Sequence, residues 1–237
     1  MNLFYHPHSA PIDKQIIFDK EESRHIGKVL RKQQGDILHT TNGKGDLFEV
    51  QLESVAPKQC IGAIKKVTQQ EPLPYSLHMA VAPTKLNDRF EWFLEKATEI
   101  GITEITPIIC DHSERKVIKP ERYEKIVQSA MKQSLKTFLP TLNPATTFSE
   151  FVTNNTNRKT LRCIAHCEET EKQSLKDLLH PHKDVLICIG PEGDFSSKEI
   201  KTALEMGFKP VSLGNSRLRT ETAAIVACHS VAFVNET

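Results

Sequence analysis

The sequence lacks several features that would settle its class at once. Among its 237 residues, no apolar run approaches the roughly 20 that a membrane-spanning helix needs. The first residues, MNLFYHPHSAP, have neither the basic start nor the apolar core of a secretory signal peptide. We therefore expect a protein that makes no use of a membrane and resides in the cytoplasm.

A strong net charge is also missing. The chain has 31 Lys and Arg against 30 Asp and Glu, which gives a formal net charge of +1. A nucleic-acid partner would therefore have to be recognised through local basic patches rather than through the overall field. The hydrophobic fraction of 38% and the charged fraction of 26% are ordinary for a folded soluble chain and exclude a disordered or membrane class.

Paired cysteine motifs are absent. The six cysteines are scattered without any C-x-x-C, so we expect reduced thiols rather than a disulfide framework. Cys163, His166 and Cys167 lie close in sequence, but no second ligand pair occurs at the spacing of a zinc site. These three residues are interpreted as part of a buried strand and its following loop, and no metal is expected.

Several common catalytic and nucleotide-binding motifs do not occur. There is no G-x-x-x-x-G-K-[ST] and no early G-x-G-x-x-G, which excludes a P-loop and an ordinary dinucleotide fingerprint. There is also no G-x-S-x-G nucleophile elbow and no H-E-x-x-H zinc motif. The function has to be sought in less common patterns.

The first 72 residues predict a small β-barrel with one helix. Short alternating runs, separated by turn signals, predict strands over residues 16–18, 37–41, 47–53 and 60–67. The helix is expected over residues 23–32. It would carry on one face a basic stripe made of Arg24, Lys28, Arg31 and Lys32. Such a stripe is typical of RNA-contacting helices and also of plain solvated ones.

Residues 73–237 predict a second, α/β domain. The segment 71–74 contains two prolines, which cannot continue a strand ladder, and is the expected linker. Strands are then expected over residues 77–82, 105–109, 161–165 and 185–189. Helices are expected from Asp88 to Ile100, with a capping box to Glu91, and from Pro120 onward. This alternation predicts a largely parallel sheet covered on both faces.

Two loops near the C-terminus share a strand–turn–helix pattern. The first spans residues 189–200 (IGPEGDFSSKEI) and the second residues 212–224 (SLGNSRLRTETAA). Loops of this kind place backbone N–H groups and a positive helix end beside a ligand. Without a ligand, they are two tight turns of an α/β sheet, each followed by a well-capped helix.

Capping signals follow each loop. Ser196 and Glu199 form a predicted capping box, and Gly207 would end the helix that they begin. Thr220 is expected to cap the last helix. Glu221 falls in the first turn of that helix, where negative charge is favoured.

As sequences, the two loops resemble those of the bacterial ribosomal RNA small subunit methyltransferase E family. These are 16S rRNA (uracil-N3)-methyltransferases of the SPOUT superfamily. The likeness extends to HIGKVLR at residues 25–31, EKATEIGITEITP at 95–107 and Gln133-Ser134. The matching segments are spread over nearly the whole chain in the expected order. The pairing of G-P-E-G with L-R-T-E-T-A one helix apart is highly specific.

The resemblance implies an N-terminal PUA-like β-barrel (1–72) that binds RNA. It implies a C-terminal SPOUT α/β domain (73–237) with a deep trefoil knot, which binds S-adenosyl-L-methionine, carries the catalytic residues and forms a homodimer. Carried over by position, the cofactor-binding residues would be His166, Ile189, Gly190, Pro191, Glu192, Gly193, Leu213, Gly214, Leu218, Thr220 and Ala223.

The implied reaction is methylation of N3 of a uridine in the decoding region of 16S rRNA, within the small ribosomal subunit. Because N3 keeps its proton until well above neutral pH, transfer needs a base or a cation that stabilises the anionic ring. We expect Arg219 to stabilise charge on a uracil carbonyl, and Glu221 or Glu192 to accept or orient the proton. The alternatives are a helix-dipole role for Glu221 and a salt bridge between Arg219 and Glu221.

RNA contacts would come from basic residues of both domains, which position the phosphate backbone rather than read its sequence. They are Arg24, Lys28, Arg31, Lys32, Arg115, Lys116, Lys119 and Arg122. The chain departs from the family pattern at a few positions. Asp194 stands in place of a second glycine after G-P-E-G, Ser216 in place of an arginine, and Lys132 and Lys136 in place of Glu and Arg.

Two other functions remain open. One is a 2′-O-ribose methyltransferase of tRNA or rRNA from the same superfamily, although the barrel and the L-R-T-E-T-A loop argue against it. The other is a non-catalytic RNA-binding or ribosome-assembly protein that has kept the fold. Identifying the methylated nucleoside separates the first alternative, and the absence of cofactor turnover would identify the second.

Overall fold

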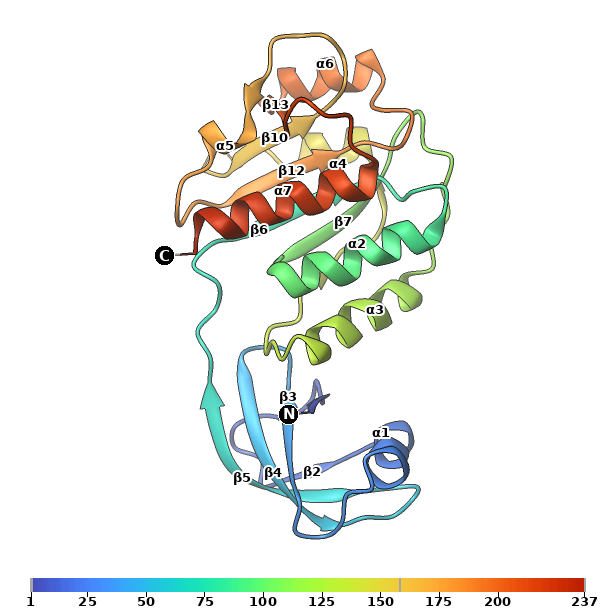
Figure 1. Ribbon diagram of the computed structural model, residues 1–237, viewed down its shortest axis with the longest axis vertical. Coiled ribbons are helices and arrows are strands. Elements are labelled where there is room, and N and C mark those ends of the chain that lie inside the picture. Colours follow the sequence, from blue (N-terminus) through green and yellow to red (C-terminus); the bar gives the residue numbers. More distant parts are fainter. Residues whose placement is uncertain (1, 158, 237) are drawn as a thin grey trace. The chain divides into compact units, whose positions relative to one another are not determined.

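Figure 1 shows the computed structural model, which describes residues 2–157 and 159–236. The chain forms two compact units. The first comprises the N-terminal segment up to Pro72 together with Gln128–Leu139, and the second comprises Leu73–Val127 and the chain from Pro140 onward. Helix α3 (Pro120–Gln133) begins at its proline, as expected, and contributes residues to both units.

The first unit contains a five-stranded sheet in the order β1-β3-β4-β5-β2. The strands are β1 (Leu3–Tyr5), β2 (Gln15–Ile17), β3 (Ile37–Thr41), β4 (Asp46–Ser54) and β5 (Ile61–Gln69). Within the described chain, β1 and β2 each pair with a single neighbour, so the predicted barrel is a half-barrel sheet. Its core contains Phe4, Ile16, Phe48 and Val50.

The helix expected over residues 23–32 is wrong in its bounds and its regularity. An α-helix, α1 (Lys20–Arg24), begins after Asp19, whose carboxylate accepts a hydrogen bond from the Glu22 N–H at 2.8 Å. It continues as a π-helix, η1 (His25–Val29), and Arg31 then takes a left-handed φ of 54°. The wider π-turn changes the residue spacing. The four basic residues therefore do not share one α-helical face.

The segment 128–139 is bound to this first unit by specific contacts. Lys132 pairs with Glu22 at 2.9 Å. The Thr41 hydroxyl donates to the Thr137 carbonyl at 3.0 Å. Gly45, at φ 100°, lies directly against the Phe138 ring, where a Cβ would come within 2.5 Å of the ring. Each of these contacts joins residues that are far apart in sequence, so the sequence pattern of residues 1–72 could not predict them.

The second unit is built on an eight-stranded sheet with the order β11-β13-β10-β12-β6-β7-β8, and β9 pairs with β7. All its pairings are parallel, as expected. The strands are β6 (Leu77–Val81), β7 (Glu104–Ile109), β8 (Thr141–Leu142), β9 (Thr146–Thr147), β10 (Leu161–Ala165), β11 (Gln173–Ser174), β12 (Val185–Ile189) and β13 (Lys209–Ser212).

Helices cover both faces of this sheet. Helices α2 (Asn87–Ile100) and α7 (Thr220–Val234) pack side by side on one face (Figure 1). Helices α4 (Phe148–Asn154) and α6 (Ser197–Glu205) contact each other over the opposite face, where Phe151 and Ile200 join the core. A short helix, α5 (Leu175–Leu178), follows β11. The described chain has no helix long and apolar enough to cross a membrane.

The capping predictions have mixed outcomes. The Ser196–Glu199 box is confirmed, since the Ser196 N–H donates to the Glu199 carboxylate at 2.8 Å and its hydroxyl accepts from the Glu199 N–H at 3.3 Å. Gly207 follows the end of α6 with φ 82°, also as predicted. The Asp88–Glu91 box is wrong: α2 begins at Asn87 without a side-chain cap, and the Glu91 carboxylate binds Arg122 instead.

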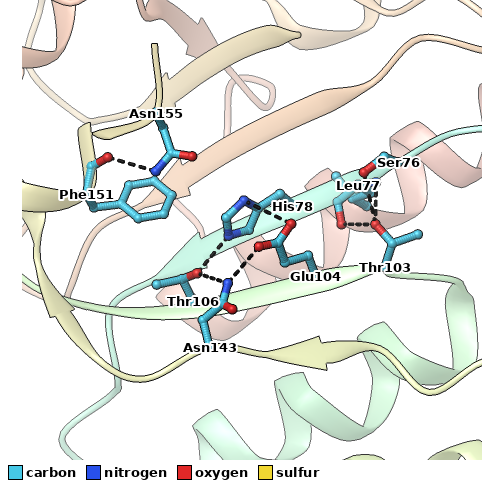
Figure 2. A network of polar contacts seen from close by, with 9 residues as sticks. All are labelled: Ser76, Leu77, His78, Thr103, Glu104, Thr106, Asn143, Phe151 and Asn155. Atoms are coloured by element: carbon cyan, nitrogen blue, oxygen red, sulfur yellow. Dashed lines mark hydrogen bonds and ion pairs between the residues drawn. The ribbon is translucent and has the colours of Figure 1, made fainter. Parts of the chain in front are cut away.

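A polar network occupies the amino-terminal edge of the large sheet (Figure 2). The His78 Nε2 lies 2.7 Å from the Thr106 hydroxyl, and its Nδ1 lies 3.5 Å from the Glu104 carboxylate. The Asn143 amide donates to Glu104 at 2.7 Å and to Thr106 at 2.8 Å. Burial lowers the pKa of His78, and Glu104 opposes that shift. Both ring nitrogens of His78 therefore have partners.

Candidate functional site

Two adjoining cavities lie at the carboxyl ends of β10, β12 and β13, the edge where ligands bind in open α/β sheets. Their volumes are about 460 and 310 Å³, within the range typical of small-molecule sites. Both are lined by the last residue of β10, Ala165, and the last residue of β12, Ile189. They also share Cys167, Arg217, Leu218 and Ala223, so the same loops enclose both.

The first loop depends on a glycine directly after β12. A Cβ on Gly190 would come within 3.1 Å of the Phe195 ring and 3.2 Å of the Phe195 nitrogen, so a side chain at that position would require Phe195 to shift by a few tenths of an ångström. Gly190, Pro191 and Glu192 line the smaller cavity. Gly193 lines neither cavity and packs against His112 instead, which places it apart from the other predicted cofactor residues.

The second loop is tied to the first through Thr220. This residue does not cap α7, contrary to the prediction: Arg219 is at the cap position, and Thr220 is the first helical residue. The Thr220 hydroxyl donates instead to the Gly190 carbonyl at 3.1 Å. Leu213 and Gly214 line the larger cavity, and Thr220 lines the smaller one. The two loops thus form one continuous wall.

The third wall follows β10 and contains His166. This side chain is only 7% exposed, and neither of its ring nitrogens has a hydrogen-bond partner within the described chain. Burial and the nearby Lys172 ammonium lower the pKa of His166, while Asp194 and Glu168 act in the opposite direction. Buried polar atoms are nearly always paired, so these two nitrogens, which line the larger cavity, are available to hydrogen-bond a molecule bound there.

Asp194 connects the first loop to the segment after β10, and the sequence did not predict this contact. Its carboxylate accepts a hydrogen bond from the Cys167 N–H at 2.7 Å, and its backbone has a left-handed φ of 63°. Aspartate tolerates that conformation better than most residues other than glycine. Cys167, Lys172 and Arg217 also line the cavities, although none of them was predicted to bind the cofactor. No local sequence signal links residues 167 and 194.

The two predicted catalytic side chains have different surroundings. Arg219 is exposed, lines the smaller cavity, and its guanidinium has no polar partner within the described residues. Glu221 is 8% exposed and lies outside both cavities. One of its oxygens lies 3.8 Å from the Arg89 Nε, and the other has no hydrogen-bond partner in the described chain. The structure therefore pairs Glu221 with Arg89 rather than with Arg219.

Glu192, the other expected proton acceptor, is exposed and already engaged. Its carboxylate accepts a hydrogen bond from the Lys85 N–H at 2.9 Å, which joins the first loop to the segment before α2. No group of three or more His, Cys, Asp or Glu side chains among the described residues is arranged to hold a metal ion. None of the six cysteines, all of which lie in the described part of the chain, forms a disulfide, and Cys167 is the one that is exposed.

The comparisons with known proteins agree along the whole chain. Residues 71–232 match the RNA methyltransferase domain family, and residues 18–65 match the RNA methyltransferase PUA domain family. The ribosomal RNA small subunit methyltransferase E of Buchnera aphidicola is 33% identical over 222 residues, which cover 90% of this chain and 86% of that protein. The chain belongs to the ribosomal RNA small subunit methyltransferase E family.

Solved structures support the same assignment. A crystal structure described as a probable rRNA methyltransferase from Porphyromonas gingivalis shares 42% identity and a TM-score of 0.92, over 99% of this chain and 98% of that one. A ribosomal RNA small subunit methyltransferase E from Neisseria gonorrhoeae, solved with bound S-adenosyl methionine, shares 27% identity and a TM-score of 0.86, with 99% and 98% covered. As a family member, the chain is an RNA methyltransferase.

Several of the basic residues predicted to contact RNA already bind other groups of the protein. Arg115 is used structurally, since its guanidinium donates to the Thr84 carbonyl at 3.0 Å and to the Lys85 carbonyl at 2.8 Å. Arg122 pairs with Glu91 and Lys32 with Asp36. Lys116 lines a separate cavity of about 300 Å³ beside Phe148 and Glu199. The residues Arg24, Lys28, Arg31, Lys32, Arg115, Lys116, Lys119 and Arg122 are distributed over both units.

Proposed function

We propose that this chain transfers the methyl group of S-adenosyl-L-methionine to N3 of a uridine in the decoding region of 16S rRNA. The proposal is carried by the two adjoining cavities, which are walled by the family's two signature loops and by a buried histidine without a partner in the described chain. The names of the relatives and the cofactor-bound Neisseria structure support it. Because bacterial ribosomal RNA is cytoplasmic, we place the protein in the cytoplasm.

The cavity walls fit the proposed cofactor. Adenine needs apolar surfaces together with backbone donors and acceptors, which Ile189, Leu213 and Leu218 with their peptide groups provide. His166 has two nitrogen atoms that await a partner. We propose as cofactor-binding the predicted residues that line the two cavities, namely His166, Ile189, Gly190, Pro191, Glu192, Leu213, Gly214, Leu218, Thr220 and Ala223. When bound, the cofactor supplies an electrophilic methyl group.

Arg219 is proposed to stabilise negative charge on the uracil ring. It lines the cavity, and its guanidinium has no partner among the described residues, so it is available to a substrate carbonyl. A preorganised cation at a developing negative charge lowers the barrier more than it strengthens ground-state binding. The loop that carries Arg219 is fixed by the bond between Thr220 and Gly190, which keeps the cation in place.

Glu221 is proposed to accept or orient the N3 proton. Arg89 lies 3.8 Å from one carboxylate oxygen, while the other oxygen is buried and lacks a donor in the described chain. An unpaired buried carboxylate oxygen is costly, and an N–H donor would relieve that cost. Glu192 is a weaker candidate for the proton acceptor, because its carboxylate already binds the Lys85 N–H.

RNA would be held by the first unit, which we propose acts as a PUA-like RNA-binding domain, and by Arg24, Lys28, Arg31, Lys32, Arg115 and Lys116. We propose that residues 1–72 bind RNA and that residues 73–237 bind the cofactor, carry out catalysis and form the dimer. The family matches over residues 18–65 and 71–232 support a division into these two domains. The contacts would be to phosphates, and the target base would have to be turned out of its stack.

A homodimer through the α2–α7 layer is part of the proposal. Phe233 on α7 is 65% exposed, and Trp92 on α2 is 44% exposed. Large apolar side chains exposed on two packed helices favour a partner surface. Analytical ultracentrifugation of Phe233→Glu tests this, because a dimer formed there would dissociate, whereas an unchanged sedimentation coefficient would exclude this face.

A trefoil knot in the second unit is also proposed from the resemblance. The supporting observation is the path of the last segment: it leaves β13, near one edge of the sheet, yet α7 packs over the central strands β6 and β12. Thr220 at the start of α7 is bonded to Gly190, in the loop that follows β12. A crystal structure traced from end to end tests whether the chain passes through that loop.

The experiment for the proposed reaction uses small ribosomal subunits from a strain lacking this gene and methyl-labelled S-adenosylmethionine. Digestion and mass spectrometry of the nucleosides should show labelled 3-methyluridine. A labelled 2′-O-methyl nucleoside would favour the alternative ribose methyltransferase. Absence of label together with absence of cofactor binding would leave only the non-catalytic RNA-binding protein.

A further inference from the structure

Another cavity lies at the opposite edge of the same sheet. Its volume is about 630 Å³, larger than either cavity of the candidate site. It is lined by Leu161, the first residue of β10, and by Lys209, the first residue of β13. The candidate site contacts the last residue of β10, Ala165, so the two sites are separated by the length of that strand, roughly 13 Å at about 3.3 Å per residue.

Positive charge is concentrated in this cavity. Its lining contains four Lys or Arg side chains and one acidic side chain, Glu205, which gives a formal local charge of 4 − 1 = +3. The whole chain has a formal net charge of only +1, so the positive charge of this cavity does not simply reflect a generally basic protein surface. The C-terminal end of α6 adjoins it at Met206, but a helix end offsets only about half a charge. The cations are Lys159, Arg162, Lys183 and Lys209.

The three lysines have no internal counter-charge. Within the described residues, Lys159, Lys183 and Lys209 make no ion pair, and their ammonium groups make no hydrogen bond. Glu205 is itself 4.0 Å from Lys201. Like charges gathered around one cavity repel one another, and an anion placed among them relieves that repulsion.

Arg162 distinguishes this cavity from a surface that merely carries lysines. It lies on β10, its guanidinium sits 5.3 Å above the Phe208 ring, and one terminal nitrogen donates to the Asn155 carbonyl at 2.7 Å. Gly207 closes the other side, where a Cβ would come within 3.1 Å of the second terminal nitrogen. That second nitrogen has no hydrogen-bond partner in the described chain. A held guanidinium with donors to spare is suited to phosphate.

We propose that this cavity binds a phosphate group of the RNA substrate's backbone. The choice of RNA rests on the proposed function, while the choice of phosphate rests on the four cations. No Phe, Tyr or Trp among the described residues lines the cavity, so it offers no surface on which a base could stack. Contacts of this kind position an RNA without reading its sequence, and they do so here at the far edge of the catalytic domain.

The test compares the full-length protein with the double variant Lys183→Gln/Lys209→Gln. A matched control, Lys125→Gln/Lys176→Gln, removes two exposed charges of the same unit that do not line the cavity. Binding to small ribosomal subunits is measured over a range of salt concentrations. Methyl transfer is measured on the same substrate, and cofactor affinity by calorimetry. Arg162 is left intact because its contacts to Asn155 and Phe208 support the fold.

The cavity variant should bind subunits more weakly, and the slope of log affinity against log salt should decrease by about one for each phosphate that is no longer neutralised. The KM for subunits should rise with unchanged kcat and unchanged cofactor affinity, and the control should match the original protein. Equal slopes for the cavity variant and its control would overturn the proposal. If neither the original protein nor its variants transfer methyl groups, the proposed function fails. The salt slopes of subunit binding then still test whether this cavity binds phosphate.

Discussion

Two histidines at opposite edges of one parallel sheet differ in the partners of their ring nitrogens. Both are largely buried, and burial is the main cause that lowers the pKa of each. At the amino-terminal edge, both ring nitrogens of His78 have partners, in Thr106 and Glu104. At the carboxyl-terminal edge, neither nitrogen of His166 has one within the described chain. The first is the pattern of a structural group, and the second is that of a group that awaits a ligand.

The same contrast extends to the residues around each histidine. Asn143 and Glu104 complete a closed network beside His78. At the other edge, the Arg219 guanidinium and one Glu221 oxygen lack partners within the described residues. This difference between the cluster around His78 and the cluster around His166 supports the proposal that a bound molecule completes the second cluster.

Replacing Arg219 should have the largest effect. Arg219→Ala removes the unpaired cation of the carboxyl-terminal edge, and methyl transfer should fall by about 10²–10³-fold, as for the loss of one oxyanion donor. Because the side chain is exposed and bonded to no other described group, the melting temperature and cofactor affinity should stay the same. Single-turnover methyl transfer measures the effect. Retention of most of the turnover would show that Arg219 is not catalytic.

Exchanging each histidine for alanine sharpens the comparison directly. His166→Ala should weaken cofactor binding by roughly tenfold, since it removes one or two hydrogen bonds to the ligand, while leaving no internal group without a partner. His78→Ala should instead lower the free energy of unfolding by about 1–3 kcal/mol, because Thr106 and Glu104 lose a partner. Calorimetric titration and urea unfolding measure the two effects. If both variants changed the cofactor affinity and the free energy of unfolding in the same way, the contrast between the two histidines would be contradicted.

Asp194 should contribute a smaller effect through the cavity wall. Asp194→Asn keeps a residue that tolerates the left-handed backbone but removes the charge that accepts the Cys167 N–H. Cofactor affinity should fall several-fold, corresponding to roughly 1 kcal/mol for a charge-assisted bond at a partly exposed site. Asp194→Gly serves as a control, since it leaves φ unstrained and also lacks the carboxylate. An affinity unchanged in both variants would contradict this role for Asp194.

The pH dependence of stability should show a modest effect of His78. Since burial lowers its pKa in the folded state, the unfolded chain takes up the proton more readily. The stability contribution of neutral His78 is therefore complete above the ordinary value of 6.5 and declines as the pH falls below it, by no more than about 1.4 kcal/mol per pH unit. Urea unfolding at several pH values should show a flatter profile for His78→Gln, and identical profiles would exclude the effect.

Sequence reasoning succeeded where structure depends on neighbours in the chain. The strands β10 and β12 and the capping box of Ser196 with Glu199 were predicted because alternation and capping are local. The Asp88–Glu91 box failed because Arg122, distant in sequence, takes the Glu91 carboxylate. Helix 23–32 failed because a π-turn has no clear signature in periodicity.

The candidate site was predictable only in part for the same reason. The two loops were recognised as sequences, and most of their residues do line the cavities. The bond from Asp194 to Cys167, the pairing of Arg89 with Glu221, and the contact of Gly193 with His112 join residues far apart in sequence. Contacts of this kind are decided by the packing of the loops, which no single segment encodes.

The most direct test of the proposed site asks whether S-adenosyl-L-methionine occupies the two cavities at the carboxyl-terminal edge. Cys167 lines both cavities and is the exposed thiol, whereas the other five cysteines are buried. The rate of Cys167 alkylation by iodoacetamide, followed by peptide mass spectrometry, should fall strongly at saturating S-adenosyl-L-methionine and recover when the cofactor is removed. An alkylation rate unchanged by a cofactor that calorimetry shows to be bound would place the cofactor elsewhere and contradict the proposed site.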